Sequence, residues 1–347
     1  MNFLKQILFP SFRKSGGTTL WLLRIILPIS LLVRFLDYFG VLTFIAQFLD
    51  PVFLHLGLPG GTAIIFITSI FLPLYAPLAI IMSMTVTLRE LTILALMCQI
   101  AHNLPVESAL QAKTGTSFWS MFSLRILVSI FVGVVLNLIL PKEMGMPFFE
   151  VTRAEAVTFV GDVLLSWLKG SLQMALLIFT IITVLNVVYK LLEHHNLIVN
   201  LSKAIEPVLR FFGLPASTGF LWLIGYIVGL AYGGAMMIDR MNDGKVTRSD
   251  VRTLNYHLAV SHSVIEDNLL FVALGVSVWW ILGVRLIVAW MVVWGRVLWI
   301  KIVRKRNRIK TIQASLQIEG NTLSVEQVTD LIENRRVCWL SKKIFWK

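Results

Sequence analysis

The amino-acid sequence predicts an all-α fold, a polytopic membrane protein with two inverted-topology repeats of about five helical segments each and broken helices at the midplane. Composition supports this fold, because 57% of the 347 residues are hydrophobic and only 14% are charged, whereas soluble domains average about 25% charged residues. Several apolar runs, including residues 63–82, 164–188 and 272–300, exceed the ~18 residues that a membrane-spanning helix needs. The third observation is an internal duplication.

The duplication consists of polar and turn-forming residues that recur in the same order. The tripeptide Gly57-Leu58-Pro59 returns 156 residues later as Gly213-Leu214-Pro215. Further along, the spacing becomes 160 residues, with these matched pairs: Val86 and Val246, Thr87 and Thr247, His102 and His262, Trp119 and Trp279, Arg125 and Arg285. A unit of about 120 residues is too long for a solenoid repeat and has the size of one half of a transporter.

The chain divides into five predicted parts. These are an interfacial N-terminal segment (1–18), membrane repeat one (19–141), an extracytoplasmic connecting loop (142–163), membrane repeat two (164–300) and a basic cytoplasmic tail (301–347). Each repeat is expected to contain a long helix, an amphipathic stretch ending at Gly-Leu-Pro, a helix, a shorter helix ending at the histidine, and a final helix. The three long helices are expected at residues 20–36, 63–82 and 118–140, and again at 172–192, 219–238 and 276–300.

Loop charges predict the orientation of the repeats. Residues 239–252 contain four lysines and arginines, whereas the matching residues 83–90 contain only Arg89. Because cytoplasmic loops are enriched in basic residues, the two loops are expected on opposite sides, which requires inverted repeats and an odd number of crossings in each. Five crossings satisfy that condition, although the amphipathic stretches could instead lie in the interface. Both termini are then cytoplasmic, in a multi-pass protein of the inner (cytoplasmic) membrane.

A basic cluster follows the last apolar run and contributes to the net charge of +12. It suits anionic lipid headgroups better than nucleic acid, so we expect the lipid bilayer as a partner and no nucleic acid. A cytoplasmic partner at this tail, or a homo-oligomer, is compatible with the sequence. In the tail, Ser324 and Gln327 form a capping-box pattern for a helix through Asn334. The basic residues are Lys301, Arg304, Lys305, Arg306, Arg308 and Lys310.

The candidate site is formed by polar residues where apolar helices should continue. Each repeat places an imidazole and a carboxylate about one turn apart, and Pro105 indicates that the helix of repeat one breaks there. Carboxylates inside a membrane are costly unless they are paired, hydrated or bound to a cation. Because inverted repeats bring two such breaks together, we expect one shared site of these residues: His102, Glu107, His262, Glu266 and Asp267.

Three interpretations of this site remain open. Imidazole and carboxylate ligands suit a divalent cation such as iron, manganese or zinc. The same side chains could relay protons. Alternatively, the histidines are polar residues at helix ends and the carboxylates pair with arginine. The sequence implies no certain cofactor beyond such a bound divalent metal.

Two matched arginines lie inside the final helices. Arg125 and Arg285 could neutralise Glu107 and Asp267, bind a carboxylate or phosphate group of an anionic substrate, or extend toward the membrane edge. Asn103, Ser263 and Asn268 are the supporting polar side chains. An organic substrate would use them as hydrogen-bond donors together with the arginines.

The remaining motifs are structural or absent. Gly225, Gly229 and Gly233 are spaced as a ridge on which another helix can approach closely. The sequence contains no HExxH, GxSxG or GxxxxGK[ST] motif, so we do not expect an enzyme.

The paired Gly-Leu-Pro turns and the polar breaks "AHNLPVES" and "SHSVIEDN" resemble the nucleoside-recognition or Gate domain family. Concentrative nucleoside transporters, the membrane part of the ferrous-iron transporter B and the spore-maturation membrane proteins share this domain. The resemblance covers residues 20–300 as two tandem Gate units and implies a transport-like architecture without fixing a substrate. Cys98 does not form the intramembrane cysteine pair of iron transporters, and no GTP-binding motif is present.

Together these observations predict a transporter or permease for a small solute, with a divalent metal cation as the favoured substrate. Few aromatic residues flank the breaks, so a pocket that stacks a nucleobase is not evident. The alternatives are a nucleoside or organic-anion transporter and a non-transporting membrane scaffold or sensor that acts through a partner.

Overall fold

The computed structural model describes residues 8–148, 160–194, 201 and 204–334, and within these ranges it contains helices and no strand. The predicted all-α class is therefore confirmed. The chain separates into two compact units, Met1–Trp290 and Met291–Lys347.

The described helices occur in two sets of matching order, in which the five segments expected for each repeat are subdivided by further breaks. The first set comprises α1 (Phe9–Tyr38), α2 (Val41–Phe53), α3 (Ala63–Phe71), α4 (Tyr75–Ile81), α5 (Leu88–Ile100), α6 (Leu104–Lys113) and α7 (Phe118–Ile139). The second set comprises α8 (Val160–His194), α10 (Glu206–Phe211), α11 (Gly219–Ile227), α12 (Leu230–Asn242), α13 (Arg248–Leu258), α14 (Val264–Val272) and α15 (Val278–Ile318). The boundary between the two compact units falls within α15, and α16 (Val325–Asn334) follows it.

Matched positions of the two repeats have the same local structure. Gly57 and Gly213, after α2 and α10, have positive φ values of 69° and 71°. Thr87 and Thr247 begin α5 and α13 with capping boxes, in which the threonine hydroxyl accepts from a backbone N–H three residues later. The duplication therefore extends from the sequence to turns and helix starts.

Residues 63–82 do not form the single helix that their apolar run predicts. α3 ends at Phe71 and α4 begins at Tyr75, with Leu72 extended at φ −128° and ψ 159°. Leu72 precedes Pro73, and a proline ring disfavours the helical conformation of the residue before it. The prediction of one continuous helix is wrong here, and Pro73 is the cause of the break.

Residues 219–238 are also divided, at Gly229, so the second predicted continuous helix is wrong as well. Gly229 has φ 97° and ψ 177°, a conformation that glycine adopts readily, and a Cβ there would lie 2.5 Å from Oγ of Ser263. Gly225, Gly229 and Gly233 consequently do not form a ridge on one helix. A Cβ on Gly233 would lie 3.4 Å from Cα of Gly225, so these glycines let α11 and α12 pack closely together.

Four helices of the described ranges are long and apolar enough to cross a membrane. They are Leu88–Lys113, Phe118–Ile139, Trp167–Val184 and Val278–Ile318. The pair Asp50–Leu56 and Gly60–Phe71, bent by 89°, makes a fifth if it counts as one span. The other apolar segments of the two repeats are short helices separated by breaks, which fits the expectation of broken helices in each repeat.

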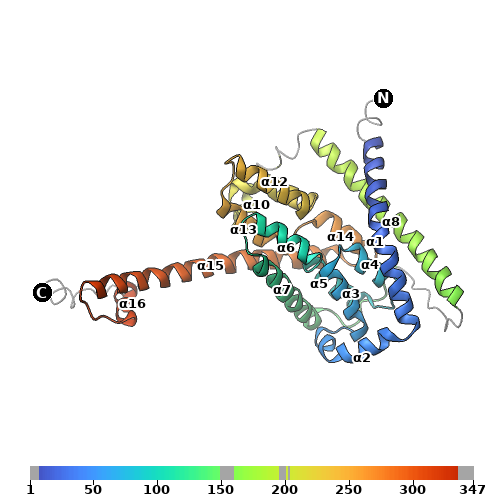
Figure 1. Cartoon of the computed structure of the whole chain (residues 1–347), viewed down its shortest axis with the longest axis horizontal. Coiled ribbons are helices and arrows are strands. Elements are labelled where there is room, and N and C mark those ends of the chain that lie inside the picture. The colour runs from blue at the N-terminus through green and yellow to red at the C-terminus, as the bar shows by residue number, and fades with distance from the viewer. Residues whose placement is uncertain (1–7, 149–159, 195–200, 202–203, 335–347) are drawn as a thin grey trace. The chain divides into compact units, whose positions relative to one another are not determined.

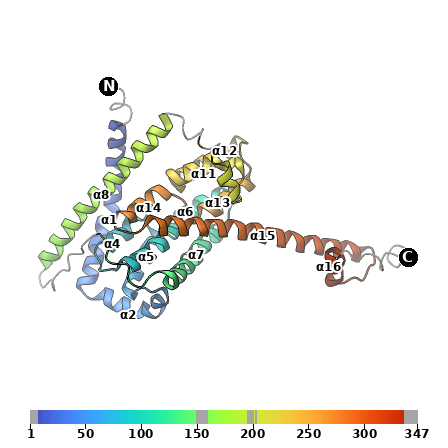
Figure 2. The same cartoon turned by 180° about the vertical axis from the view of Figure 1, so that it is seen from behind.

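The long helices α1 and α8 lie side by side in both Figure 1 and Figure 2. Asn186 Nδ2 on α8 donates to Oγ of Ser15 on α1 over 3.0 Å, and the rings of Phe12 and Phe179 lie 6.0 Å apart. This pairing joins the first long helix of repeat one to that of repeat two.

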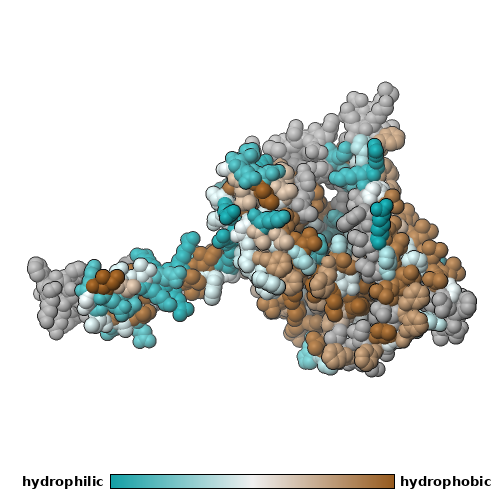
Figure 3. Space-filling view, in the orientation of Figure 1, coloured by the Kyte–Doolittle hydropathy of each residue, from teal (hydrophilic) through white to brown (hydrophobic). Residues whose placement is uncertain are grey.

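The first unit has an apolar exterior and a polar centre. Figure 3 shows much of its surface coloured as hydrophobic, and Phe44, Phe48 and Leu138 are each more than 70% exposed. By contrast, Arg125 and Arg285 are fully buried. An apolar surface around buried charged groups is the arrangement expected when lipid replaces water as the surrounding medium.

In the second unit, the six basic residues at positions 301–310 are exposed. Ile309 and Val328 are buried. The predicted capping box is confirmed, since Ser324 N donates to Oε1 of Gln327 over 2.8 Å and Gln327 N donates to Oγ of Ser324 over 3.2 Å. α16 then ends at Asn334, as the sequence predicts.

Candidate functional site

The site lies where two helices break at matched positions, between α5 and α6 and between α13 and α14. Asn103 and Ser263 both adopt the left-handed conformation, with φ values of 48° and 45°, which few residues other than glycine adopt. Asn103 N donates to the carbonyl of Ser69 over 2.8 Å, and Ser263 N donates to that of Gly225 over 2.9 Å. Each break is thus hydrogen-bonded to an earlier helix of its repeat, α3 or α11.

A buried arginine supports each break from the final helix of its repeat. Arg125 donates to the carbonyls of Ile100 (2.7 Å) and His102 (3.0 Å). Arg285 donates to the carbonyls of Val260 (3.4 Å) and His262. These bonds satisfy carbonyls that the interrupted helices leave without backbone partners.

The same arginines also pair with carboxylates. Arg125 Nη1 lies 2.5 Å from Oε2 of Glu107, and Arg285 Nη2 lies 3.2 Å from Oδ2 of Asp267. This is the geometry of the counterion interpretation. Because neither arginine is exposed, neither extends toward the membrane edge.

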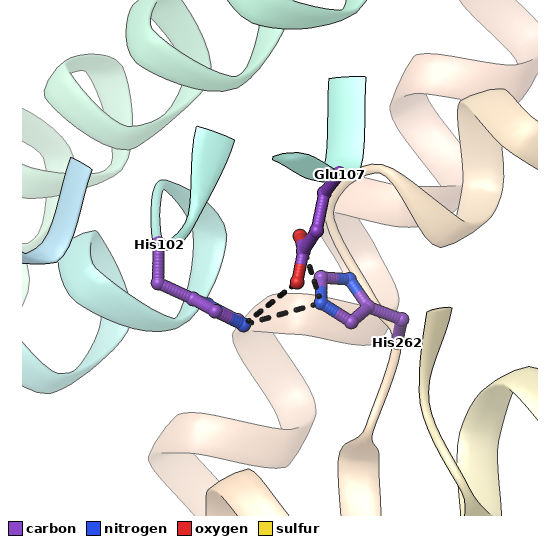
Figure 4. A group of neighbouring side chains, drawn as sticks. All are labelled: His102, Glu107 and His262. Carbon is purple, nitrogen blue, oxygen red and sulfur yellow. Dashed lines mark hydrogen bonds and ion pairs between the residues drawn. The ribbon is translucent and has the colours of Figure 1, made fainter. Parts of the chain in front are cut away.

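Three side chains from the two breaks converge on one point (Figure 4). His102 Nε2 lies 3.4 Å from Oε1 of Glu107, and His262 Nε2 lies 3.3 Å from Oε2 of Glu107. The two imidazole Nε2 atoms are 3.3 Å apart. Ligand atoms of the three residues, one from each, all lie within 4.8 Å of one another, so the structure brings together three of the five predicted site residues.

Backbone contacts orient both imidazole rings toward this point. His102 Nδ1 lies 3.0 Å from the carbonyl oxygen of Gln99, and His262 Nδ1 lies 2.8 Å from that of Leu258. A carbonyl accepts only, so each Nδ1 carries a proton, and each ring turns its Nε2 toward Glu107. The same second-shell arrangement orients histidines that bind metals.

The remaining two predicted ligands lie outside the group of three. Asp267 pairs with Arg285. Glu266 accepts a hydrogen bond from the hydroxyl of Tyr75 on α4. The five-residue site of the sequence analysis therefore separates into three convergent side chains and two neighbouring carboxylates.

A cavity of about 90 Å³ adjoins the convergent side chains. Its charged or titratable lining consists of His102, Glu107, Glu266 and Asp267, and Asn103 and Ser263 line it as well. Tyr75 also lines the cavity. The supporting residues Asn103 and Ser263 thus lie beside the predicted site.

Two residues of the site were not identified from the sequence. Gln99, fully buried, donates from Nε2 to the backbone carbonyl of Asp267 and to Oδ1 of Asn268, both over 3.0 Å, and so joins α5 to α14. Arg285 Nη1 lies 3.5 Å from the same Oδ1, which places Asn268 among the supporting residues. Gln99 is recognisable in the sequence as an amide side chain inside an apolar run. No feature of the sequence indicates a role for Tyr75, because its partner Glu266 is 191 residues away.

Comparison with known proteins supports a membrane location. The chain is 29% identical over 292 residues to the uncharacterized membrane protein YvoD of Bacillus subtilis (strain 168), an alignment that covers 82% of this chain and 92% of that relative. No family model and no solved structure matches the chain. With this similarity and several apolar helices, the chain is a membrane protein in contact with the lipid bilayer.

Proposed function

We propose that the protein is a transporter or permease that moves a small solute across the inner membrane, with a divalent cation as the favoured substrate. The observation that carries this proposal is the convergence of two imidazole Nε2 atoms and one carboxylate where two broken helices meet. His102, Glu107 and His262 offer the nitrogen and oxygen ligands that iron, manganese and zinc accept. Broken helices inside a membrane protein are tolerated where they face protein or a wet cavity.

The charges around the cavity favour a cation over an anion. When Glu107, Glu266 and Asp267 are ionised and the histidines are neutral, three carboxylates face the two guanidinium groups of Arg125 and Arg285. One negative charge then remains, which a bound cation offsets. The arginines are already engaged by carboxylates and carbonyls, so they are poor anchors for an anionic substrate.

The volume of the cavity favours a cation over a nucleoside as the substrate. At about 90 Å³ the cavity holds a hydrated ion or a few waters, whereas pockets for organic ligands measure about 300–1,000 Å³. The resemblance to Gate domains and the matched local structure of the repeats support a transport architecture with inverted repeats. A nucleoside would require the breaks to open much further.

Proton transfer is a second candidate function for the same residues. The 3.3 Å separation of the two Nε2 atoms allows one proton to be shared between the rings, with Glu107 as its counterion. Under this alternative the protein binds protons but no divalent metal.

Thermal unfolding of the purified protein in detergent tests the proposal. A ligand that binds only the native state raises the melting temperature with concentration, so Fe²⁺, Mn²⁺ and Zn²⁺ are titrated against the wild type and a His102→Ala/His262→Ala variant. His55→Ala is the matched control, because the exposed side chain of His55 hydrogen-bonds only to the carbonyl of Pro51 among the bonds described.

We expect a shift that the double variant loses and the control keeps, and cation uptake into proteoliposomes that follows the same pattern. No shift with any of the three metals would contradict the cation proposal. Equal shifts in all three proteins would exclude these histidines as ligands.

A further inference from the structure

The cavity beside the three convergent side chains is lined by acidic but not by basic residues, apart from one histidine. Its residues include the carboxylates of Glu107, Glu266 and Asp267 and the imidazole of His102, and no lysine or arginine lines it. Arg125 and Arg285 pair with Glu107 and Asp267 but are not among the lining residues. A cation in this cavity is therefore close to three carboxylates and to the imidazole of His102.

Glu266 differs from the other two carboxylates in its partner. Glu107 and Asp267 each pair with a buried arginine, but in the part of the chain that the structure describes no basic side chain pairs with Glu266. Its hydrogen bond comes from the neutral hydroxyl of Tyr75. Glu266 thus has an uncompensated charge when it is ionised.

Asp267 also lines the cavity and can accept a hydrogen bond there. Its Oδ2 is buried, forms the 3.2 Å ion pair with Arg285, and makes no hydrogen bond among the described residues. Asp267 is only 4% exposed and lines the cavity. This carboxylate oxygen can therefore accept a further donor or bind a cation from the cavity.

The bond between Tyr75 and Glu266 also joins the two repeats across the cavity. Tyr75 begins α4 of repeat one, and Glu266 lies in the first turn of α14 of repeat two. The position of repeat one that matches Glu266 is Val106, which is 62% exposed and has no hydrogen-bonding group. The side chain of Val106 therefore cannot form the hydrogen bond that Glu266 forms with Tyr75.

We propose that Glu266 is a transfer position for the divalent cation on its way to His102, Glu107 and His262, and that the Tyr75 hydroxyl holds Glu266 until the cation arrives. This inference rests on the proposed function and names its entry step. The cation displaces the Tyr75 hydroxyl from the Glu266 carboxylate. The hydrogen bond that joined the two repeats at this position is then broken. No covalent bond forms or breaks.

Two variants separate the charge of Glu266 from its hydrogen bond. Glu266→Gln keeps an oxygen that accepts from Tyr75 but removes the charge. Tyr75→Phe removes the hydrogen bond but keeps the charge. Glu206→Gln is the matched control, because Glu206 is an exposed carboxylate paired with Arg210 on α10.

Stopped-flow mixing of Mn²⁺ or Zn²⁺ with the purified full-length protein, followed with a competing fluorescent indicator, gives association and dissociation rates. For Glu266→Gln we expect association about tenfold slower and dissociation slower as well, because the cation passes the same position in both directions. For Tyr75→Phe we expect both rates to rise about fivefold, the effect of one lost hydrogen bond. The control should keep the rates of the wild type.

Unchanged association in both variants would overturn the inference. Slower association with faster dissociation in Glu266→Gln would also overturn it, because this is the effect of a lost charge that merely attracts the bound ion. A wild type that binds no cation, or binding that is unchanged in His262→Ala, would instead remove the proposed function itself.

Discussion

The two repeats build the same helix break around the same buried arginine, yet their carboxylates lie differently. In repeat one, Glu107 contacts Arg125, His102 and His262. In repeat two, Asp267 pairs with Arg285 and is not part of the convergent group. Glutamate is one methylene longer than aspartate. The duplicated scaffold thus supplies the break and the arginine in both repeats, and the length of the carboxylate side chain determines which one reaches the histidines.

A second difference separates the repeats at four buried positions that the duplication aligns. His257 Nε2 lies 3.0 Å from Nε1 of Trp222 and 2.7 Å from the hydroxyl of Tyr226. Tyr226 in turn lies 3.0 Å from Oγ of Ser261. The matched residues of repeat one are the apolar Phe66, Ile70, Met97 and Ala101. An indole N–H only donates, so His257 accepts at Nε2 and is neutral, which makes this cluster a structural feature of repeat two.

The largest effect is expected from Glu107→Ala. It removes one cation ligand and leaves Arg125 buried without its carboxylate, which should lower the stability by about 3–5 kcal/mol. Loss of the ligand should weaken cation binding by about 100-fold or more. Thermal unfolding in detergent and equilibrium cation titration measure the two effects.

The exchange Glu107→Asp tests the methylene argument itself. The variant gives repeat one the carboxylate of repeat two, so we expect the pairing with Arg125 to be retained and cation binding to weaken about tenfold. The matched control is Asp267→Glu. Native affinity in Glu107→Asp would show that side-chain length does not distinguish the repeats.

The next effect concerns the arginines. Arg125→Lys should lower the stability by about 3 kcal/mol, because an ammonium group cannot reproduce the contacts with two carbonyls and Glu107. Arg285→Lys should cost less, about 1–2 kcal/mol, because its contacts with the carbonyl of Val260 (3.4 Å) and with Asp267 (3.2 Å) are longer. Denaturation curves for the two variants decide this, and equal losses would show that the two breaks depend equally on their arginines.

A smaller effect is expected from His257→Met, which introduces the residue found at the matched position of repeat one. Trp222 loses its acceptor, so the stability should fall by about 1–3 kcal/mol, while cation binding stays at the wild-type level. Met97→Leu serves as the control of similar volume. Weakened cation binding in His257→Met would mean that the polar cluster of repeat two belongs to the site.

The smallest effect is expected in the tail. Ser324→Ala removes the hydroxyl that accepts from the backbone of Gln327 and should destabilise α16 by about 1 kcal/mol. Hydrogen exchange of the α16 amides should accelerate about fivefold, with unchanged cation binding. A loss of cation binding would instead support the scaffold or sensor hypothesis, in which the tail acts through a partner.

The sequence was sufficient to predict the all-α class, the duplication and the three convergent residues. Ionisable side chains are rare in apolar runs, so His102, Glu107 and His262 were visible against their surroundings. Apolar composition predicts continuous helices over residues 63–82 and 219–238, and it does not reveal the breaks at Pro73 and Gly229. Tyr75 and Gln99 could not be assigned their roles, since each acts through a partner in the other repeat. The separation of Glu266 and Asp267 from the convergent group depends on side-chain length and direction, which spacing along the chain does not specify.

The proposed cation site requires that both imidazoles bind one divalent cation together with Glu107. Electron spin-echo envelope modulation of Mn²⁺ bound to the purified protein detects nitrogen atoms that are directly coordinated to the ion. Histidine labelled with ¹⁵N identifies those nitrogens as imidazole. We predict nitrogen coupling from two histidines, reduced in His262→Ala and absent in the His102→Ala/His262→Ala variant. Bound Mn²⁺ without nitrogen coupling, or coupling that persists in the double variant, would show that these histidines do not bind the cation.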